Sequence, residues 1–146
     1  MTSDSASQQG RPRAFSGQTI LVVDDEDTLL YVIRRLLEDA GYGVVEAANG
    51  LQALGQLNDP RAAIHVVLSD IRMPVMNGWE LTAAIVRSHR TLPVILMSGF
   101  GTTFLESSVH PQVNFLPKPF ARERLLNLLR QVLSADPGAT LRRSLP

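Results

Sequence analysis

The chain has 146 residues, of which 45% are hydrophobic, and its 14 basic and 14 acidic residues cancel to a formal net charge of zero. A chain of this length can bury the core of one domain. The neutral balance argues against a dedicated nucleic-acid binder and against a polybasic membrane-surface protein. The sequence contains no cysteine, which excludes disulfides, thiolate zinc sites and cysteine nucleophiles.

The two ends of the chain differ in composition from its middle. Residues 1–17 are rich in Ser, Gln, Gly and Pro and lack the hydrophobic segment of a secretory signal, and residues 135–146 are similar in character. Both segments are predicted to be flexible tails around a domain at 18–134. Because no apolar run reaches the ~20 residues that a membrane helix needs, we expect a cytoplasmic protein without membrane insertion.

Between the tails, short apolar runs alternate with amphipathic stretches. The runs, in chain order, are 19–23, 43–47, 64–68, 93–97 and 113–116. Most of them are rich in Val, Ile and Leu without alternation, which is typical of parallel strands covered on both faces. The stretches with helical periodicity lie at 29–40, 51–57, 81–85, about 102–109 and 125–133. This β–α alternation predicts a doubly wound α/β sandwich with right-handed crossovers.

Individual residues mark the ends of several predicted helices. Gly41 is expected to cap the C-terminus of the first helix, because glycine adopts the left-handed conformation that such caps use. Asn49 precedes the second helix, and Asn77-Gly78 is interpreted as a turn and the start of the third. The fourth predicted helix is short and weakly patterned, and His110-Pro111 ends it.

Polar side chains that can bind ligands or take part in reactions follow four of the five predicted strands. Asp24 and Asp25 follow the first, Asp70 the third, Ser98 the fourth and Lys118 the fifth. In doubly wound folds, ligands bind in the crevice outside the carboxyl ends of the strands. The sequence therefore predicts that these five side chains converge on one site.

The residue types in this set narrow the chemistry. Three carboxylates brought to ~5 Å at an effective dielectric of ~20 repel by roughly 3 kcal/mol per pair, so the site must hold protons or a cation. Oxygen ligands without His or Cys favour Mg²⁺, with Mn²⁺ also suitable. A carboxylate can also attack phosphorus to form an aspartyl phosphate. Lys118 is the only lysine beside thirteen arginines, and a compact ammonium suits a phosphate contact.

Four motifs carry a family resemblance. LVVDDE (21–26), LSDIRMPVMNG (68–78), ILMSG (95–99) and FLPKPF (115–120) resemble the receiver domain of two-component response regulators. The resemblance covers about 18–134. It implies a flavodoxin-like fold, with a five-stranded parallel sheet in the order 2-1-3-4-5 and helices on both faces.

The resemblance also implies a metal site. By position, Asp70 would be the phospho-acceptor, and Asp25 and Asp70 would bind Mg²⁺ directly. Asp24 would act mainly through metal-bound water, and the backbone carbonyl of Arg72 would supply a further ligand. No organic cofactor is expected.

The remaining motif positions imply a conformational switch. Ser98 would turn toward the phosphoryl group and Lys118 would contact it. Phe115 would be the switch aromatic that rotates inward when the hydroxyl moves; it lacks the phenolic hydroxyl of the tyrosine that is frequent there, so switching would rest on packing alone. The Lys118-Pro119 bond is expected to be cis.

The function implied is a phosphorylation-controlled signalling switch in a phosphorelay. Asp70 would accept a phosphoryl group from a phosphohistidine on a sensor histidine kinase or a histidine phosphotransfer domain. The chain would not be an enzyme beyond its self-phosphorylation and autodephosphorylation. About a dozen residues follow the last predicted helix, too few for a helix-turn-helix that reads DNA. We therefore expect a stand-alone receiver or, as the wording DIRMP and ILMSGF suggests, one from a hybrid kinase.

Two other functions compete with this one. A Mg²⁺-dependent aspartyl phosphatase of the haloacid-dehalogenase type uses similar residues, but it normally carries D-x-D after the first strand, where this chain has DDE. A phosphorylation-independent interaction module is the other alternative, against which the intact set of five residues argues.

Simpler interpretations compete for single residues. Asp24, Asp25 and Glu26 could cap the following helix and complement its dipole, which is the role favoured for Glu26. Phe115 could be an ordinary core residue. Trp79 is interpreted as a partly exposed helix residue without an assigned role.

Overall fold

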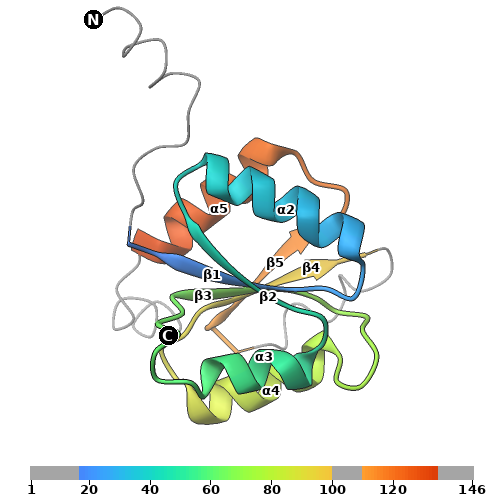
Figure 1. Ribbon diagram of the computed structural model, residues 1–146, viewed down its shortest axis with the longest axis vertical. Helices are drawn as coiled ribbons and strands as arrows, with labels where there is room; N and C mark the ends of the chain where they lie inside the picture. The colour runs from blue at the N-terminus through green and yellow to red at the C-terminus, as the bar shows by residue number, and fades with distance from the viewer. Residues whose placement is uncertain (1–16, 100–109, 135–146) are drawn as a thin grey trace, which may run out of the picture.

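The computed structural model describes residues 17–99 and 110–134. The expected C-terminal tail, the expected N-terminal tail up to residue 16 and the predicted helix at about 102–109 lie outside the described residues. The described part is a parallel sheet between two layers of helices (Figure 1). The predicted α/β class is therefore confirmed.

The sheet has five strands, and every pairing between them is parallel. The strands are β1 (Thr19–Val23), β2 (Gly43–Ala47), β3 (Val66–Asp70), β4 (Val94–Ser98) and β5 (Val113–Pro117). Their spatial order is β2-β1-β3-β4-β5, as the resemblance implied. Most strand residues of β1, β3 and β4 are fully buried, which explains why these sequences are apolar without alternation.

The bounds of three strands differ from the sequence prediction. The third strand was expected at 64–68 but runs from Val66 to Asp70, the fourth was expected at 93–97 but runs from Val94 to Ser98, and the fifth ends at Pro117 rather than at residue 116. The backbone ladder explains the later ends, because Asp70 pairs with Met97 and Ser98 with Pro117. At β3 and β4 the hydrophobicity pattern placed the predicted end at the last apolar residue, whereas backbone pairing continues through Asp70 and Ser98.

Helices cover both faces of the sheet. They are α2 (Asp27–Asp39), α3 (Gly50–Leu57), α4 (Gly78–Ser88) and α5 (Arg122–Ser134). Helices α2 and α5 lie on one face, and α3 and α4 lie on the other (Figure 1). Alternate strand residues belong to the two hydrophobic cores on opposite faces of the sheet. Ile20, Val22 and Leu68 pack under α2 and α5, while their chain neighbours Leu21, Val23 and Val67 pack under α3 and α4.

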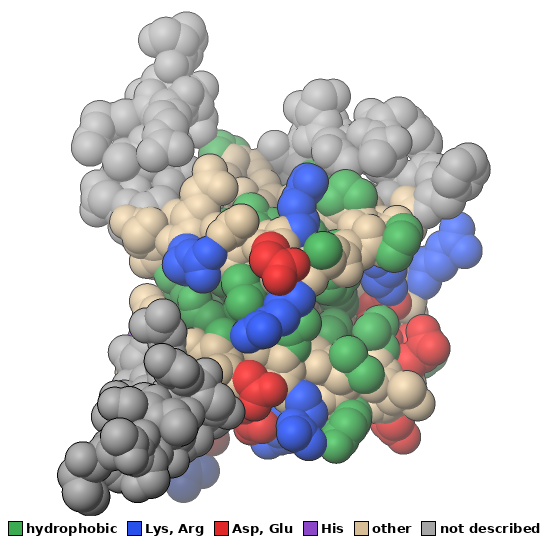
Figure 2. Space-filling view, turned by 90° about the horizontal axis from the view of Figure 1, so that it is seen from above, with side chains coloured by type: hydrophobic (Ala, Val, Ile, Leu, Met, Phe, Trp, Pro, Cys, Tyr) green, Lys and Arg blue, Asp and Glu red, His purple; other side chains and the backbone are tan. Residues whose placement is uncertain are grey.

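The α2/α5 layer carries both signs of charge. Figure 2 shows acidic and basic side chains interspersed over this side of the molecule. Arg34 on α2 pairs with Glu38 of the same helix at 3.2 Å and with Glu46 of β2 at 3.1 Å, which ties the helix to the edge of the sheet. No described helix has the length and apolar character that crossing a lipid bilayer requires.

The helix ends follow the sequence signals closely. After α2, Gly41 has a φ of 99°, and its N–H donates to the Glu38 carbonyl while the Tyr42 N–H donates to the Leu37 carbonyl, both at 3.0 Å. This is the Schellman arrangement, and it confirms Gly41 as the helix cap. At the start of α2, Glu26 occupies the N-cap position, but its side chain makes no capping hydrogen bond. Glu26 is therefore at the expected cap position, where its carbonyl accepts the first helical hydrogen bond from the Leu30 N–H at 3.0 Å, but its side chain does not cap the helix.

Asparagine side chains fix the starts of α3 and α4. The Asn49 side chain accepts a hydrogen bond from the Gln52 N–H at 2.9 Å. Asn77 and Glu80 form a reciprocal capping box, with both hydrogen bonds at 2.9 Å. These caps satisfy backbone donors in the first turns and set where the β2–α3 and β3–α4 loops end, next to the carboxyl edge of the sheet.

Candidate functional site

Three carboxylates from two strand ends meet at the carboxyl edge of the sheet. Asp24 and Asp25 follow β1 directly, and Asp70 is the last residue of β3. Because β1 and β3 are paired neighbours, one carboxylate oxygen of each residue lies within 4.8 Å of those of the other two. The structure thus brings together the three acids that the sequence placed at one site.

Asp24 is the buried member of this cluster. Its side chain has no exposed surface, and Oδ1 accepts a hydrogen bond from the Glu26 N–H at 2.9 Å. Among the described residues, Oδ2 has no hydrogen-bond partner. Burial raises the pKa of Asp24 to about 6, and the charges of Asp70 and Asp25 add to this effect against the Glu26 N–H and the Lys118 ammonium. Burial therefore disfavours the ionised form of this carboxylate, and a bound cation would stabilise that form.

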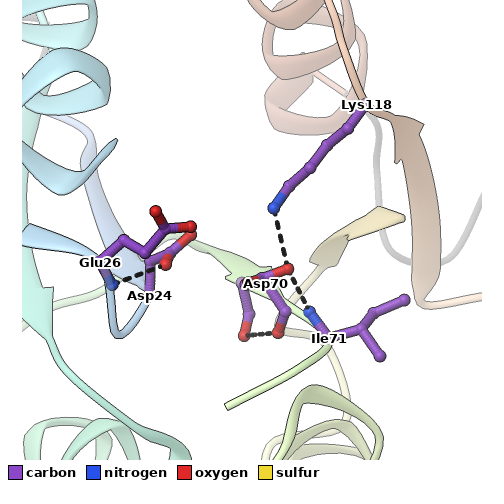
Figure 3. Close-up of polar contacts among 6 residues, drawn as sticks. Asp24, Glu26, Asp70, Ile71 and Lys118 are labelled. Atoms are coloured by element: carbon purple, nitrogen blue, oxygen red, sulfur yellow. Dashed lines mark hydrogen bonds and ion pairs between the residues drawn. The ribbon is translucent and has the colours of Figure 1, made fainter. Parts of the chain in front are cut away.

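Asp70 is held by an amide and an ammonium. Its Oδ1 accepts hydrogen bonds from the Ile71 N–H at 2.9 Å and from Lys118 Nζ at 3.0 Å (Figure 3). Lys118 reaches it from the residue after β5, where the Lys118-Pro119 bond is cis, as expected, and the Lys118 N–H donates to the Ser98 carbonyl at 2.8 Å. The ion pair is partly buried, so solvent screens it less than a surface pair.

Ser98 ends β4 beside this ion pair. Its side chain is buried, and among the described residues its hydroxyl has no hydrogen-bond partner. An unsatisfied buried hydroxyl is rare in folded proteins, and it marks a donor available to a ligand. The five predicted site residues thus provide three acids in a cluster, an ammonium bound to one of them, and, at the end of the adjacent strand, a hydroxyl without a partner in the described part of the chain.

Two further predicted residues lie around this cluster. Arg72 is exposed in the β3–α4 loop, two residues after Asp70. Phe115 lies in the middle of β5, where its ring is 5.8 Å from that of Trp79, centroid to centroid, at an interplanar angle of 50°. The contact of Trp79 was not predicted, because nothing in the local sequence connects the first turn of α4 with β5.

The start of α4 packs directly on the backbone of Asp70. The Gly78 N–H donates to the Ile71 carbonyl at 2.8 Å. A Cβ at Gly78 would overlap the carbonyl oxygen of Asp70 and lie 2.8 Å from Cα of Ile71, so only glycine fits. The Asn77-Gly78 pair predicts a turn and helix start, and the structure adds this close approach to the acidic site.

The donor set fits a hard divalent cation. Among the described residues it consists of carboxylate oxygens without His or Cys, which is the chemistry of a Mg²⁺ site, and Oδ2 of Asp24, which has no partner among them, is an acceptor that a cation or its water would satisfy. With the Lys118 ammonium and the Ser98 hydroxyl alongside, the same arrangement can stabilise the negative charge of a phosphoryl group.

Comparisons with known proteins agree with this geometry. The sequence profile described as response regulator receiver domain matches residues 20–130. The chain is 35% identical over 119 residues to the transcriptional regulatory protein CpxR of Escherichia coli K12, covering 78% of this chain and 48% of the relative. It is 32% identical over 117 residues to the sensor kinase CckA of Brucella abortus, covering 79% of this chain and 12% of the relative. The chain thus spans less than half the length of both relatives.

Solved structures show the same likeness. A response regulator receiver protein from Sinorhizobium medicae superposes with a TM-score of 0.75 at 31% identity, covering 82% of this chain and 97% of the other. The receiver domain of the hybrid histidine kinase CckA gives a TM-score of 0.67 at 35% identity, covering 80% of this chain and 99% of the other.

Proposed function

Since the chain belongs to the receiver domains of two-component response regulators, we propose that Asp70 is the phospho-acceptor of a signalling switch that occupies residues 18–134. Receiver domains are phospho-acceptor switches rather than conventional enzymes, and they bind Mg²⁺ at an acidic pocket. The observation that carries the assignment is the position of Asp70: its carboxylate is bound by Lys118 at 3.0 Å and lies in a cluster with two further acids.

The phosphoryl donor is a phosphohistidine. A carboxylate oxygen of Asp70 attacks phosphorus, the phosphorus–nitrogen bond breaks, and its electron pair stays on the imidazole nitrogen. The Lys118 ammonium stabilises the charge on the transferring oxygens, and the hydroxyl of Ser98, which has no partner within the described part of the chain, donates to the phosphoryl group once it is in place. Hydrolysis of the acyl phosphate later restores the carboxylate.

Four groups would hold Mg²⁺: the carboxylates of Asp24, Asp25 and Asp70 and the backbone carbonyl of Arg72. Asp24 would act mainly through metal-bound water. When bound, the cation supplies positive charge that offsets the repulsion between the carboxylates and the incoming phosphoryl group. The raised pKa of Asp24 and its oxygen without a partner among the described residues support this role, because burial disfavours the charge of this carboxylate and a cation would offset that effect.

Switching follows from the new contacts at the acceptor. Moving a two-state switch from 1:99 to 99:1 requires about 5.5 kcal/mol of differential stabilisation. Charge-assisted hydrogen bonds contribute about 1.5–3 kcal/mol each, so a few contacts from Ser98, Lys118 and backbone amides suffice. The partner that supplies the phosphoryl group is a sensor histidine kinase or a histidine phosphotransfer domain, and the chain acts either alone or as the receiver of a hybrid kinase.

The acceptor assignment is tested with a small phosphodonor. With acetyl phosphate and Mg²⁺, the full chain is expected to gain the mass of one phosphoryl group, measured on the intact protein. Asp70→Asn is expected to gain none, because an amide does not form the acyl phosphate. Asp39→Asn, the same change on the exposed face of α2, is the matched control and is expected to be labelled normally. Equal labelling of Asp70→Asn and the unmodified chain would remove Asp70 from this role.

A further inference from the structure

An aromatic pair joins the start of α4 to the middle of β5. Trp79 is the second residue of α4, and its ring centroid lies 5.8 Å from that of Phe115 with the planes tilted by 50°. Tilted pairs at this separation are a favourable arrangement of aromatic quadrupoles. Both rings are partly buried and pack on the core beneath α3 and α4. The ring expected to switch therefore has a defined packing partner.

Trp79 is connected to the acceptor through the backbone. The Asp70 carboxylate accepts from the Ile71 N–H at 2.9 Å, and the Ile71 carbonyl accepts from the Gly78 N–H at 2.8 Å. There is no room for a Cβ at Gly78 against the Asp70 carbonyl, so the first turn of α4 packs tightly on the backbone of Asp70. A phosphoryl group on Asp70 changes what the Ile71 amide contacts, and Trp79 follows Gly78 directly.

Ser98 and Phe115 face the same side of the sheet. Leu96 pairs with Phe115 in the ladder, both belong to the core beneath α3 and α4, and Ser98 lies two residues beyond Leu96. In this structure the Ser98 hydroxyl has no partner within the described residues, and the Phe115 ring packs against Trp79. Within the described part of the chain, the unpaired hydroxyl and the paired rings thus occur together.

We propose that Trp79 is a positioning residue that holds the Phe115 ring in the resting orientation, and that occupation of the acceptor separates the two rings. This inference rests on the proposed function, because it describes how the same site is regulated. It gives the acceptor a second connection to Phe115, through Gly78 and the first turn of α4, beside the one through Ser98.

The direction of the effect follows from linkage. A contact made in the resting state alone opposes occupation of the acceptor, so removing it must tighten binding of a phosphoryl mimic. From the usual strength of aromatic pairs, the expected change is about three- to tenfold. If Trp79 had a purely structural role, replacing it would lower the stability of both states alike and leave this affinity unchanged.

The first test measures affinity without using the tryptophan. The full chain is titrated with beryllofluoride in the presence of Mg²⁺ and followed by ¹⁹F NMR. Trp79→Leu and Phe115→Leu are each expected to bind about three- to tenfold more tightly than the unmodified chain, and the double variant no more tightly than either single one. Trp79→Phe, which keeps a ring, is expected to restore near-normal affinity. Leu51→Ala, at a side chain that is 58% exposed on α3, is the control and should change nothing. Unchanged affinity in both single variants, or additive effects in the double variant, would overturn the coupling.

The second test needs no variant that could fail to fold. Trp79 is the only tryptophan in the chain, so its emission reports the pair directly. Saturating beryllofluoride with Mg²⁺ is expected to shift the emission maximum of the unmodified chain, and an unchanged spectrum at saturation would overturn the inference. The labelling with acetyl phosphate separates the two proposals. A chain that gains the phosphoryl group while its emission and the variant affinities stay constant refutes the aromatic coupling alone, whereas a chain that gains none refutes the phospho-acceptor function and the coupling together.

Discussion

Burial of one carboxylate makes the acidic site sensitive to pH. Asp24 has no exposed surface, one of its oxygens lacks a partner among the described residues, and its pKa rises from 3.8 to about 6. Because the folded state holds this proton more tightly than the unfolded chain, the ionised form of Asp24 opposes folding in the absence of a cation.

The stability of the Mg²⁺-free protein should therefore depend on pH in a defined window. The contribution of Asp24 is fully favourable below about 3.8 and is lost as the pH rises through about 6. The free energy of unfolding is expected to fall across this window by up to about 3 kcal/mol from this residue. Urea denaturation at a series of pH values measures the effect.

Substitution at Asp24 separates its contribution from those of other groups. Asp24→Asn removes the titration and should flatten the profile between about pH 4 and 7, whereas Asp39→Asn at an exposed position of α2 should leave it as it is. A profile in Asp24→Asn as steep as in the unmodified chain would show that another group carries the dependence.

At the scale of secondary structure, glycines define how the loops approach the site. Gly78 begins α4 against the backbone of Asp70, and Gly50 begins α3 with its N–H donating to the Met76 carbonyl at 3.0 Å. A Cβ at Gly50 would lie 2.6 Å from Cγ of Met76. The two helix starts and the β3–α4 loop therefore form one packed unit beside Asp70.

Gly78→Ala is expected to destabilise the fold by about 1–3 kcal/mol, because its methyl group meets backbone atoms that cannot move aside independently. Chemical denaturation measures the loss. Gly55→Ala is the matched control: Gly55 lies in α3, and among the described residues no atom outside its own helix backbone and chain neighbours lies within 4 Å of the point that a Cβ would occupy. This variant should therefore gain up to about 1 kcal/mol from helix propensity. Equal stability of Gly78→Ala and the unmodified chain would contradict the close approach.

The local sequence was sufficient to place most elements but not the contacts between them. The first two strands have the predicted bounds, and Gly41, Asn49 and Asn77 mark helix ends as expected, because these signals depend on backbone geometry within a few residues. The end of β3 was placed too early because a polar residue at a strand end is not distinguished from a loop residue by hydrophobicity. The Trp79 contact with Phe115 joins residues distant in sequence, and no local pattern encodes it.

At the scale of the whole molecule, the site is assembled from four strand ends. Asp24 and Asp25 follow β1, Asp70 ends β3, Ser98 ends β4 and Lys118 follows β5, and the strand order places β3 between β1 and β4. The rule that ligands bind at the carboxyl ends of such strands allowed the convergence to be predicted from sequence. The distances and the unpartnered oxygen of Asp24 depend on packing, and only the structure provides them.

A cation that binds this assembled site should stabilise the entire fold. Because the carboxylates are together only in the folded state, Mg²⁺ at about one hundred times its dissociation constant is expected to add about 2.7 kcal/mol to the free energy of unfolding. Thermal denaturation with Mg²⁺ and with EDTA measures this difference. Asp25→Asn should reduce it, whereas an identical melting temperature of the unmodified chain in both conditions would argue against a Mg²⁺ site.

The composition of the chain gives Lys118 one more property. It is the single lysine of the sequence, and its ammonium is already engaged with Asp70 at 3.0 Å. Acylation of a lysine side chain in this protein is therefore confined to the amine that binds Asp70, so one covalent event would remove this positive charge from the acidic cluster while leaving every arginine untouched.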